Sequence, residues 1–240
     1  MRRVLQLAAL GAVLTFAAKA DTVVMDFNGL VNPTTGVANG DEVLQYFNGG
    51  QDYLHNNGPD DGVYFSSIAE TFSNPAAGNG TGIGEFGGDP DGNTALTFVS
   101  SSSVPATMDV PAGFTSFSFY YSSPTDSPTI FFYTELDGTG SDYFQSLSLP
   151  ATGGGVGTSG CLAGYDVDCP FVLATVSLTQ TAESVNFITT ENAVVFGDFT
   201  LQTAVSEPGA FKMLGLGLAS LLAVSRRQRR LQEAIRRLRS

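Results

Sequence analysis

The segment Thr115-Ser116-Phe117-Ser118-Phe119-Tyr120-Tyr121 gives the clearest indication of the fold class. Its apolar residues Phe117, Phe119 and Tyr121 fall at every second position, with polar residues between them. Successive side chains of a β-strand point to opposite faces of the sheet, so this pattern predicts a strand with one buried face.

Similar runs recur through the middle of the chain, at residues 22–27, 95–99, 129–134, 171–178, 185–188 and 194–201. Asn-Gly pairs at 28–29, 39–40, 48–49, 57–58 and 79–80, together with Asp137-Gly138, supply residues typical of hairpin turns. No helical pattern of ten residues lies between Asp21 and Ser206. The sequence therefore predicts an all-β fold, an antiparallel β-sandwich of jelly-roll type spanning residues 21–203.

The charges of the chain are separated along its length. The 240 residues include 11 Lys and Arg against 23 Asp and Glu, but residues 21–206 contain no Lys or Arg and hold 15 Asp and 6 Glu. A protein binds the phosphate backbone of nucleic acid through Lys and Arg, so this composition excludes nucleic acid as a partner of the middle region.

The N-terminus has the pattern of an export signal. Arg2 and Arg3 precede an uncharged apolar run at 4–18, and Ala18-Lys19-Ala20 places small residues before Asp21. This pattern predicts a helical signal peptide over residues 1–20, cleaved after Ala20, that directs the chain through a bacterial inner membrane. A buried N-terminal helix is the alternative.

The two cysteines agree with an exported protein. Cys161 and Cys169 are close in sequence within a Gly- and Asp-rich segment. Disulfides persist in oxidising compartments, so the spacing predicts a small disulfide-closed loop, with two free thiols as the alternative.

The C-terminal residues 204–230 have three parts. The motif Ser206-Glu207-Pro208 is followed by an apolar segment at about 210–225 and then by a basic cluster formed by Arg226, Arg227, Arg229 and Arg230. The apolar segment predicts a short transmembrane helix, and the Arg cluster marks its cytoplasmic side. Residues 231–240 predict a basic amphipathic helix on the inner leaflet, or else a plain cytoplasmic tail.

This three-part tail resembles the PEP-CTERM sorting signal of exported Gram-negative bacterial proteins. Glu207 and Pro208 match the second and third positions of its motif, and Ser206 stands where the first Pro is expected. The resemblance implies that an exosortase cuts the chain at this motif and delivers the domain to the cell surface or beyond. An ordinary membrane anchor is the alternative. The middle region also resembles a β-sandwich ectodomain common in that group, through residues 46–50, 62–67, 95–98, 113–123 and 195–201.

One segment predicts a structural calcium site. In Asp89-Pro90-Asp91-Gly92-Asn93 the side-chain oxygens of Asp89, Asp91 and Asn93 fall at alternate positions. Calcium is a hard cation that binds several such oxygen ligands in a flexible loop. A plain Asx turn is the alternative. Weaker candidates are Asp60 with Asp61, Asp166 with Asp168, and Asp26 with Asp198.

The sequence offers few groups for catalysis. His55 is the only imidazole and no Gly-x-Ser-x-Gly motif occurs, so a Ser or Cys hydrolase is not expected. A glycosidase needs only two carboxylates, which could come from Glu70, Glu85, Glu135, Glu183 or Glu191, although solvated surface acids explain them as well. Tyr residues that could stack on sugars, or equally lie in the core, are Tyr46, Tyr53, Tyr64, Tyr120, Tyr133, Tyr143 and Tyr165.

These features together predict a non-enzymatic, exported cell-surface or extracellular-matrix protein that associates with exopolysaccharide and has no catalytic residues. Its expected partners are the export machinery, an exosortase and the inner membrane. A carboxylate-dependent glycan hydrolase or lyase on the same scaffold is the alternative.

Overall fold

The computed structural model describes residues 20–28, 30, 37–38, 40–52, 55–73, 94–101, 103–139, 141–154 and 168–204. Apart from Ala20 and Ala204 at their edges, the predicted signal peptide, sorting signal, transmembrane helix and basic tail lie outside the described residues. The predicted calcium site at Asp89, Asp91 and Asn93 also lies outside them. Within the described ranges, no helix is both long and apolar enough to cross a membrane.

The described residues are predominantly β-strand, which confirms the predicted all-β class. The elements are β1 (Thr22–Met25), β2 (Val37–Ala38), α1 (Gly40–Tyr46), β3 (Tyr64–Phe65), β4 (Ala69–Ser73), β5 (Thr94–Phe98), β6 (Thr107–Ser122), β7 (Thr129–Tyr133), β8 (Gln145–Ser148), β9 (Val172–Asn186), the 3-10 helix η2 (Ile188–Thr190) and β10 (Val195–Thr203).

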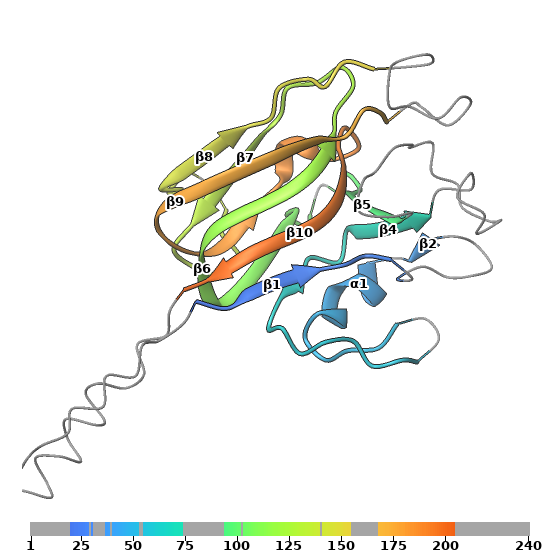
Figure 1. The fold of residues 1–240 in the computed structure, drawn as a ribbon, viewed down its shortest axis with the longest axis vertical. Coiled ribbons are helices and arrows are strands. Elements are labelled where there is room, and N and C mark those ends of the chain that lie inside the picture. Colours follow the sequence, from blue (N-terminus) through green and yellow to red (C-terminus); the bar gives the residue numbers. More distant parts are fainter. Residues whose placement is uncertain are drawn as a thin grey trace, which may run out of the picture. The chain divides into compact units, whose positions relative to one another are not determined.

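Antiparallel pairing joins these strands in the order β2-β4-β5-β10-β6-β9-β7-β8, with β1 also beside β10 and β3 also beside β6 (Figure 1). Strands β1 and β10 come from opposite ends of the domain and pair over four residues, with Val24 opposite Thr200. Strand β6 has different neighbours at its two ends. Strand β10 flanks the end with Phe117, and β3 flanks the end with Met108.

The change of neighbours occurs where β6 and β9 bulge. Their register shifts on both sides of the pair Phe114 and Ala182. Gly113 lies at this bulge with φ +72°, and a Cβ there would meet Cγ2 of Thr181 at 2.4 Å. The bend therefore requires a residue that accepts a left-handed backbone and carries no side chain.

The core consists largely of phenylalanine rings from most of the strands. Phe117 of β6 contacts Phe199 of β10 edge to face, with ring centroids 5.0 Å apart, and lies 6.4 Å from Phe132 of β7. Edge contacts of this kind add to the stabilisation that comes from burying the rings. The predicted alternation is confirmed, because Phe117, Phe119 and Tyr121 are buried and the intervening residues are partly exposed. The fully buried rings are Phe27, Phe47, Phe65, Phe98, Phe114, Phe117, Phe119, Phe132, Phe187, Phe196 and Phe199.

The strand predictions were incomplete in two respects. Residues 185–188 were predicted as a separate strand, but 185–186 are the end of the 15-residue strand β9. The short strands β2, β3, β4 and β8 were not predicted. Strand β8, for example, reads Gln145-Ser146-Leu147-Ser148 and lies at the edge of the sheet, and only its Leu147 packs against the core.

Candidate functional site

A candidate site lies on the outer face of the sheet, where β3 and β9 flank the Met108 end of β6. Tyr64 pairs with Asp109, and Asp109 pairs with Ser184 of β9, so these side chains form one row across three strands. The alternate residues Phe65 and Met108 are buried in the core. Period-two alternation therefore directs Asp109 away from the core.

The turn that follows β7 is fixed to this row by buried polar groups. Ser184 Oγ donates to the carbonyl of Glu135 at 2.6 Å and accepts from the backbone N–H of Gly138 at 3.0 Å. Asn186 Nδ2 donates to the carbonyl of Gly138 at 2.9 Å. Gly138 packs on the ring of Tyr133, where a Cβ would approach to 2.2 Å. These contacts hold the turn above β9.

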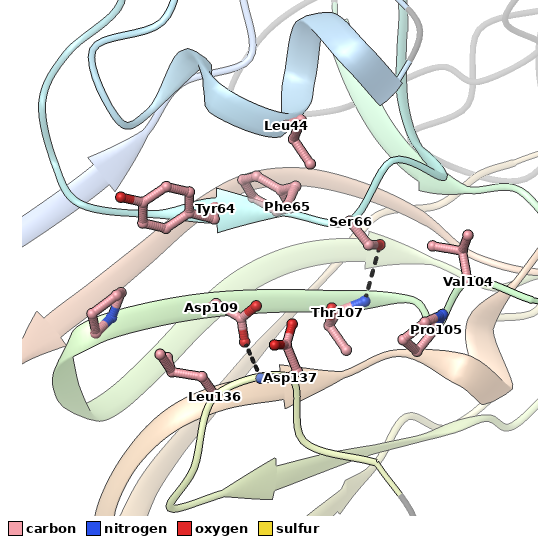
Figure 2. Close-up of a pocket in the computed structure, with 11 residues that line it drawn as sticks. Leu44, Tyr64, Phe65, Ser66, Val104, Pro105, Thr107, Asp109, Leu136 and Asp137 are labelled. Atoms are coloured by element: carbon pink, nitrogen blue, oxygen red, sulfur yellow. Dashed lines mark hydrogen bonds between the residues drawn. The ribbon is translucent and has the colours of Figure 1, made fainter.

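The turn places a second carboxylate beside the first. Asp137 has φ +52°, a left-handed conformation that Asp tolerates better than most residues. Its backbone N–H donates to Oδ1 of Asp109 at 2.8 Å (Figure 2). The side chain of Asp137 lies close enough to that of Asp109 to affect its carboxyl group. Two acidic side chains that are 28 positions apart in the sequence therefore form one pair.

This arrangement changes the acidity of Asp109. Burial raises the pKa of its carboxyl group from 3.8 to about 6. The hydrogen bond from the Asp137 backbone acts in the opposite direction, while the charge of Asp137 and the proximity of its side chain raise the pKa further. The site can therefore hold a proton at mildly acidic pH.

The pair faces a pocket of about 540 Å³, within the usual range for small-ligand sites. In Figure 2, Leu44 of α1 and Tyr64 of β3 lie on one side of the space, and Asp109, Asp137 and Leu136 lie on the other. The remaining lining residues are Phe65, Ser66, Val104, Pro105, Thr107 and Pro111. Mostly apolar walls thus surround two adjacent carboxyl groups.

The geometry of the pair limits the chemistry open to it. Among the residues described, no group of three or more His, Cys, Asp or Glu side chains could hold a metal ion. The pair is suited to accept hydrogen bonds from a ligand or to bind a positively charged group.

Several residues singled out in the sequence lie elsewhere. Cys169 is buried and disulfide-bonded, and its predicted partner Cys161 lies outside the described residues. Strands β1 and β10 do pair, and Asp198 Oδ1 accepts from the backbone N–H of Phe27 at 3.3 Å. Asp26 Oδ1 accepts instead from the N–H of Asn28 at 2.7 Å.

The other two pairs of acidic residues were weaker candidates for a calcium site. Burial, followed by the charge of Asp60, raises the pKa of Asp61. Asp166 lies outside the described residues, whereas Asp168 is described and half-buried.

The predicted glycosidase acids are dispersed over the described chain. Burial raises the pKa of Glu70, which lies on β4. Glu135 is exposed in the turn after β7, Glu183 lies on β9, Glu191 follows η2, and Glu85 is outside the described residues.

The tyrosines divide between the core and the surface. Tyr64 lines the pocket, Tyr133 is buried, and Tyr143 is exposed and lies against Phe131 with ring centroids 4.8 Å apart. Tyr46 packs on Phe47 with centroids 5.1 Å apart. Tyr120 is half-buried on β6, and Tyr53 and Tyr165 are outside the described residues.

Sequence reasoning did not identify Asp109 or Asp137 as site residues. The only signal at either position was the turn pair Asp137-Gly138, which does lie in the connection between β7 and β8. Asp109 lies between the buried residues Met108 and Val110, and this alternation places it on an outer face of the strand. The alternation does not indicate which other residue lies beside it.

Comparisons with known proteins add little to this description. No family model matches the chain, and no curated protein matches its sequence. Among solved structures, the chain is similar to the crystal structure of the cleaved adhesin domain of Lys-gingipain. The sequences are 12% identical and the TM-score is 0.38, over 76% of this chain and 98% of that chain. A likeness at this level is too weak to support an inference. The fold and the site thus define an antiparallel all-β domain with one acidic, apolar-walled pocket described on its outer face.

Proposed function

We propose that this chain is an exported bacterial cell-surface or extracellular-matrix protein whose β domain binds exopolysaccharide and catalyses no reaction. The pocket carries the binding proposal, because it places Tyr64 and apolar side chains beside the oxygens of Asp109 and Asp137. Sugar rings offer C–H faces that pack on such walls, and their hydroxyl groups donate hydrogen bonds to carboxylates.

The proposed route to the surface rests on the sequence. Residues 1–20 act as the signal peptide, and residues 204–230 act as a PEP-CTERM-like sorting signal that an exosortase cuts at Ser206-Glu207-Pro208. Before this cut, the helix at about 210–225 and the Arg cluster at 226–230 anchor the chain in the inner membrane. The absence of Lys and Arg from residues 21–206 supports the proposal, because it confines the membrane-binding charges to the two ends.

The proposal includes the finer features of the fold. Strand β10 lies between β5 and β6, and β9 lies between β6 and β7. Neighbours that are not consecutive in sequence are typical of Greek-key and jelly-roll sandwiches, so this order supports the jelly-roll type. A structural calcium ion at Asp89, Asp91 and Asn93 belongs to the same proposal.

Mass spectrometry of the protein recovered from outside the cell tests the export route. We expect an N-terminus at Asp21 and a C-terminus near Ser206. An intact C-terminus at Ser240 in the extracellular form would contradict processing, and retention of Met1 in the cytoplasm would contradict export.

Retention on columns of immobilised exopolysaccharide tests the binding role. We expect Tyr64→Ala to reduce retention, because it removes an aromatic wall of the pocket. Tyr143→Ala is the matched control, since Tyr143 is exposed and does not line the pocket. Equal retention of the two variants would place binding elsewhere, and no retention of the unaltered domain would refute the function.

A further inference from the structure

The carboxyl pair of the pocket has no basic side chain of its own domain to neutralise it. Residues 21–206 contain no Lys or Arg, and the only histidine, His55, does not line the pocket. Paired carboxylates in a partly buried site repel each other unless a proton or another cation lies between them. When neither carboxyl group is protonated, a positive charge at this site must therefore come from outside the domain.

The negative charge of the pocket favours some classes of polysaccharide over others as its ligand. A glycan that carries carboxylate or sulfate groups would be repelled by the pair and by the 15 Asp and 6 Glu of residues 21–206. A neutral glycan can enter but leaves the repulsion within the pair unchanged. A glycan with protonated amino groups compensates the pair directly, because an ammonium group has three donors for carboxylate oxygens.

The dimensions and walls of the pocket suit a sugar that carries such a group. The volume of about 540 Å³ is large enough for more than an isolated ammonium ion. Leu44, Tyr64 and Leu136 offer apolar surface beside the carboxyl pair, so a ring can pack on the walls while its amino group reaches Asp109 and Asp137.

We propose that the pocket binds an amino sugar with a free ammonium group, as found in a deacetylated aminoglycan, with the ammonium between Asp109 and Asp137 and the ring against Tyr64. This inference rests on the proposed glycan-binding function and specifies the class of glycan. Acetylation of the amino group removes its charge and adds bulk at the contact, so the N-acetylated sugar binds more weakly.

Two conservative variants test the carboxyl pair. Asp109→Asn keeps an Oδ1 atom that can accept the hydrogen bond from the N–H of Asp137. Asp137→Asn keeps a residue type that tolerates the observed φ of +52°. The matched control is Asp126→Asn, which removes one exposed charge outside the pocket. Thermal unfolding of each variant verifies that it is folded.

Calorimetry at neutral pH and physiological salt measures the binding of two ligands to the disulfide-bonded protein recovered from outside the cell. The ligands are a β-1,4-linked glucosamine tetrasaccharide and its N-acetylated counterpart. Salt at this level screens attraction that arises only from the overall charge of the domain. We expect the glucosamine tetrasaccharide to bind more tightly than the acetylated one. We expect Asp109→Asn and Asp137→Asn each to lose about tenfold or more in affinity, as is typical when a charge-assisted hydrogen bond is removed. The affinity of Asp126→Asn should stay within about twofold of the unaltered domain.

Each other outcome has a defined meaning. Equal binding of the two tetrasaccharides, or equal losses in all three variants, overturns the amino-sugar inference but leaves a glycan-binding domain. Binding of tetralysine as tight as that of the glucosamine tetrasaccharide overturns it as well, because the pocket would then select any cation. Binding of neither tetrasaccharide, together with no retention on exopolysaccharide, overturns the proposed function itself.

Discussion

The backbone N–H of Asp137 donates a 2.8 Å hydrogen bond to Oδ1 of Asp109, joining a turn to a strand that lies 28 positions earlier in the chain. This bond holds the backbone of the turn that carries Asp137 beside the carboxyl group of Asp109. It depends on the left-handed backbone of Asp137 and on the buried groups of Ser184 and Asn186 that hold the turn. The site is therefore built from several weak constraints, each of which can be tested separately.

The first prediction concerns pH. The pKa of Asp109 is raised from 3.8 to about 6 in the folded protein, so the unfolded chain binds fewer protons than the folded one between these values. The stabilising contribution is complete below pH 3.8 and is lost as pH rises through about 6. We therefore expect the stability of the unaltered protein to decrease between about pH 4 and about pH 7, and that of the Asp109→Asn variant to decrease less. Thermal unfolding at a series of pH values measures both.

The control for this measurement is Asp126→Asn. The raised pKa values of Asp61 and Glu70 give the unaltered protein a pH dependence of the same sign, so only the difference between variants is informative. Identical pH profiles for Asp109→Asn and Asp126→Asn would show that Asp109 does not titrate in this way.

The second prediction concerns Ser184, whose hydroxyl satisfies the carbonyl of Glu135 and the N–H of Gly138. Ser184→Ala leaves both backbone groups without this partner, which should lower the free energy of unfolding by about 2 kcal/mol. Urea unfolding measures the change. Ser146→Ala on the exposed side of β8 should change the stability by less than about 0.5 kcal/mol. A loss no larger than that of the control would mean that the turn does not depend on Ser184.

The third prediction concerns Gly138, the glycine of the turn that packs on Tyr133. A Cβ at Gly138 would lie 2.2 Å from Cγ of Tyr133 and 2.5 Å from Oγ of Ser184, so Gly138→Ala must displace one of them. We expect a loss of about 3 kcal/mol, at the upper end for overpacking. Gly62→Ala, with φ +67° and open space around the position, should cost about 1 kcal/mol from backbone strain alone. Equal losses would show that Tyr133 yields without cost.

The fourth prediction concerns the aromatic core. Phe117 is fully buried and lies against the rings of Phe119, Phe187 and Phe199. Phe117→Ala should lower the free energy of unfolding by about 3 to 5 kcal/mol, because it removes buried apolar surface and leaves a cavity. Val24→Ala, at a side chain that is 54% exposed, should change it by less than about 0.5 kcal/mol. Denaturant unfolding compares them, and similar losses would contradict the assigned core.

The strands that could be predicted from the sequence are those with apolar residues at every second position or in short continuous runs, such as Ala95-Leu96-Thr97-Phe98 of β5. The segment 115–121 lies within β6, and 129–134 and 194–201 correspond to β7 and β10 within a few residues. Short strands gave no such signal. Strand β3 has only Tyr64 and Phe65, and its pairing with β6 depends on contacts from a distant part of the chain.

The all-β class and the separation of an acidic domain from basic ends follow from the sequence, because alternation and charge are local properties of the chain. The site is visible only in the folded protein. Asp109 and Asp137 meet because β6 pairs with β9, β9 pairs with β7, and the turn after β7 folds back over Ser184. Strand register and the burial of a turn arise from long-range packing, which no local pattern of residues encodes.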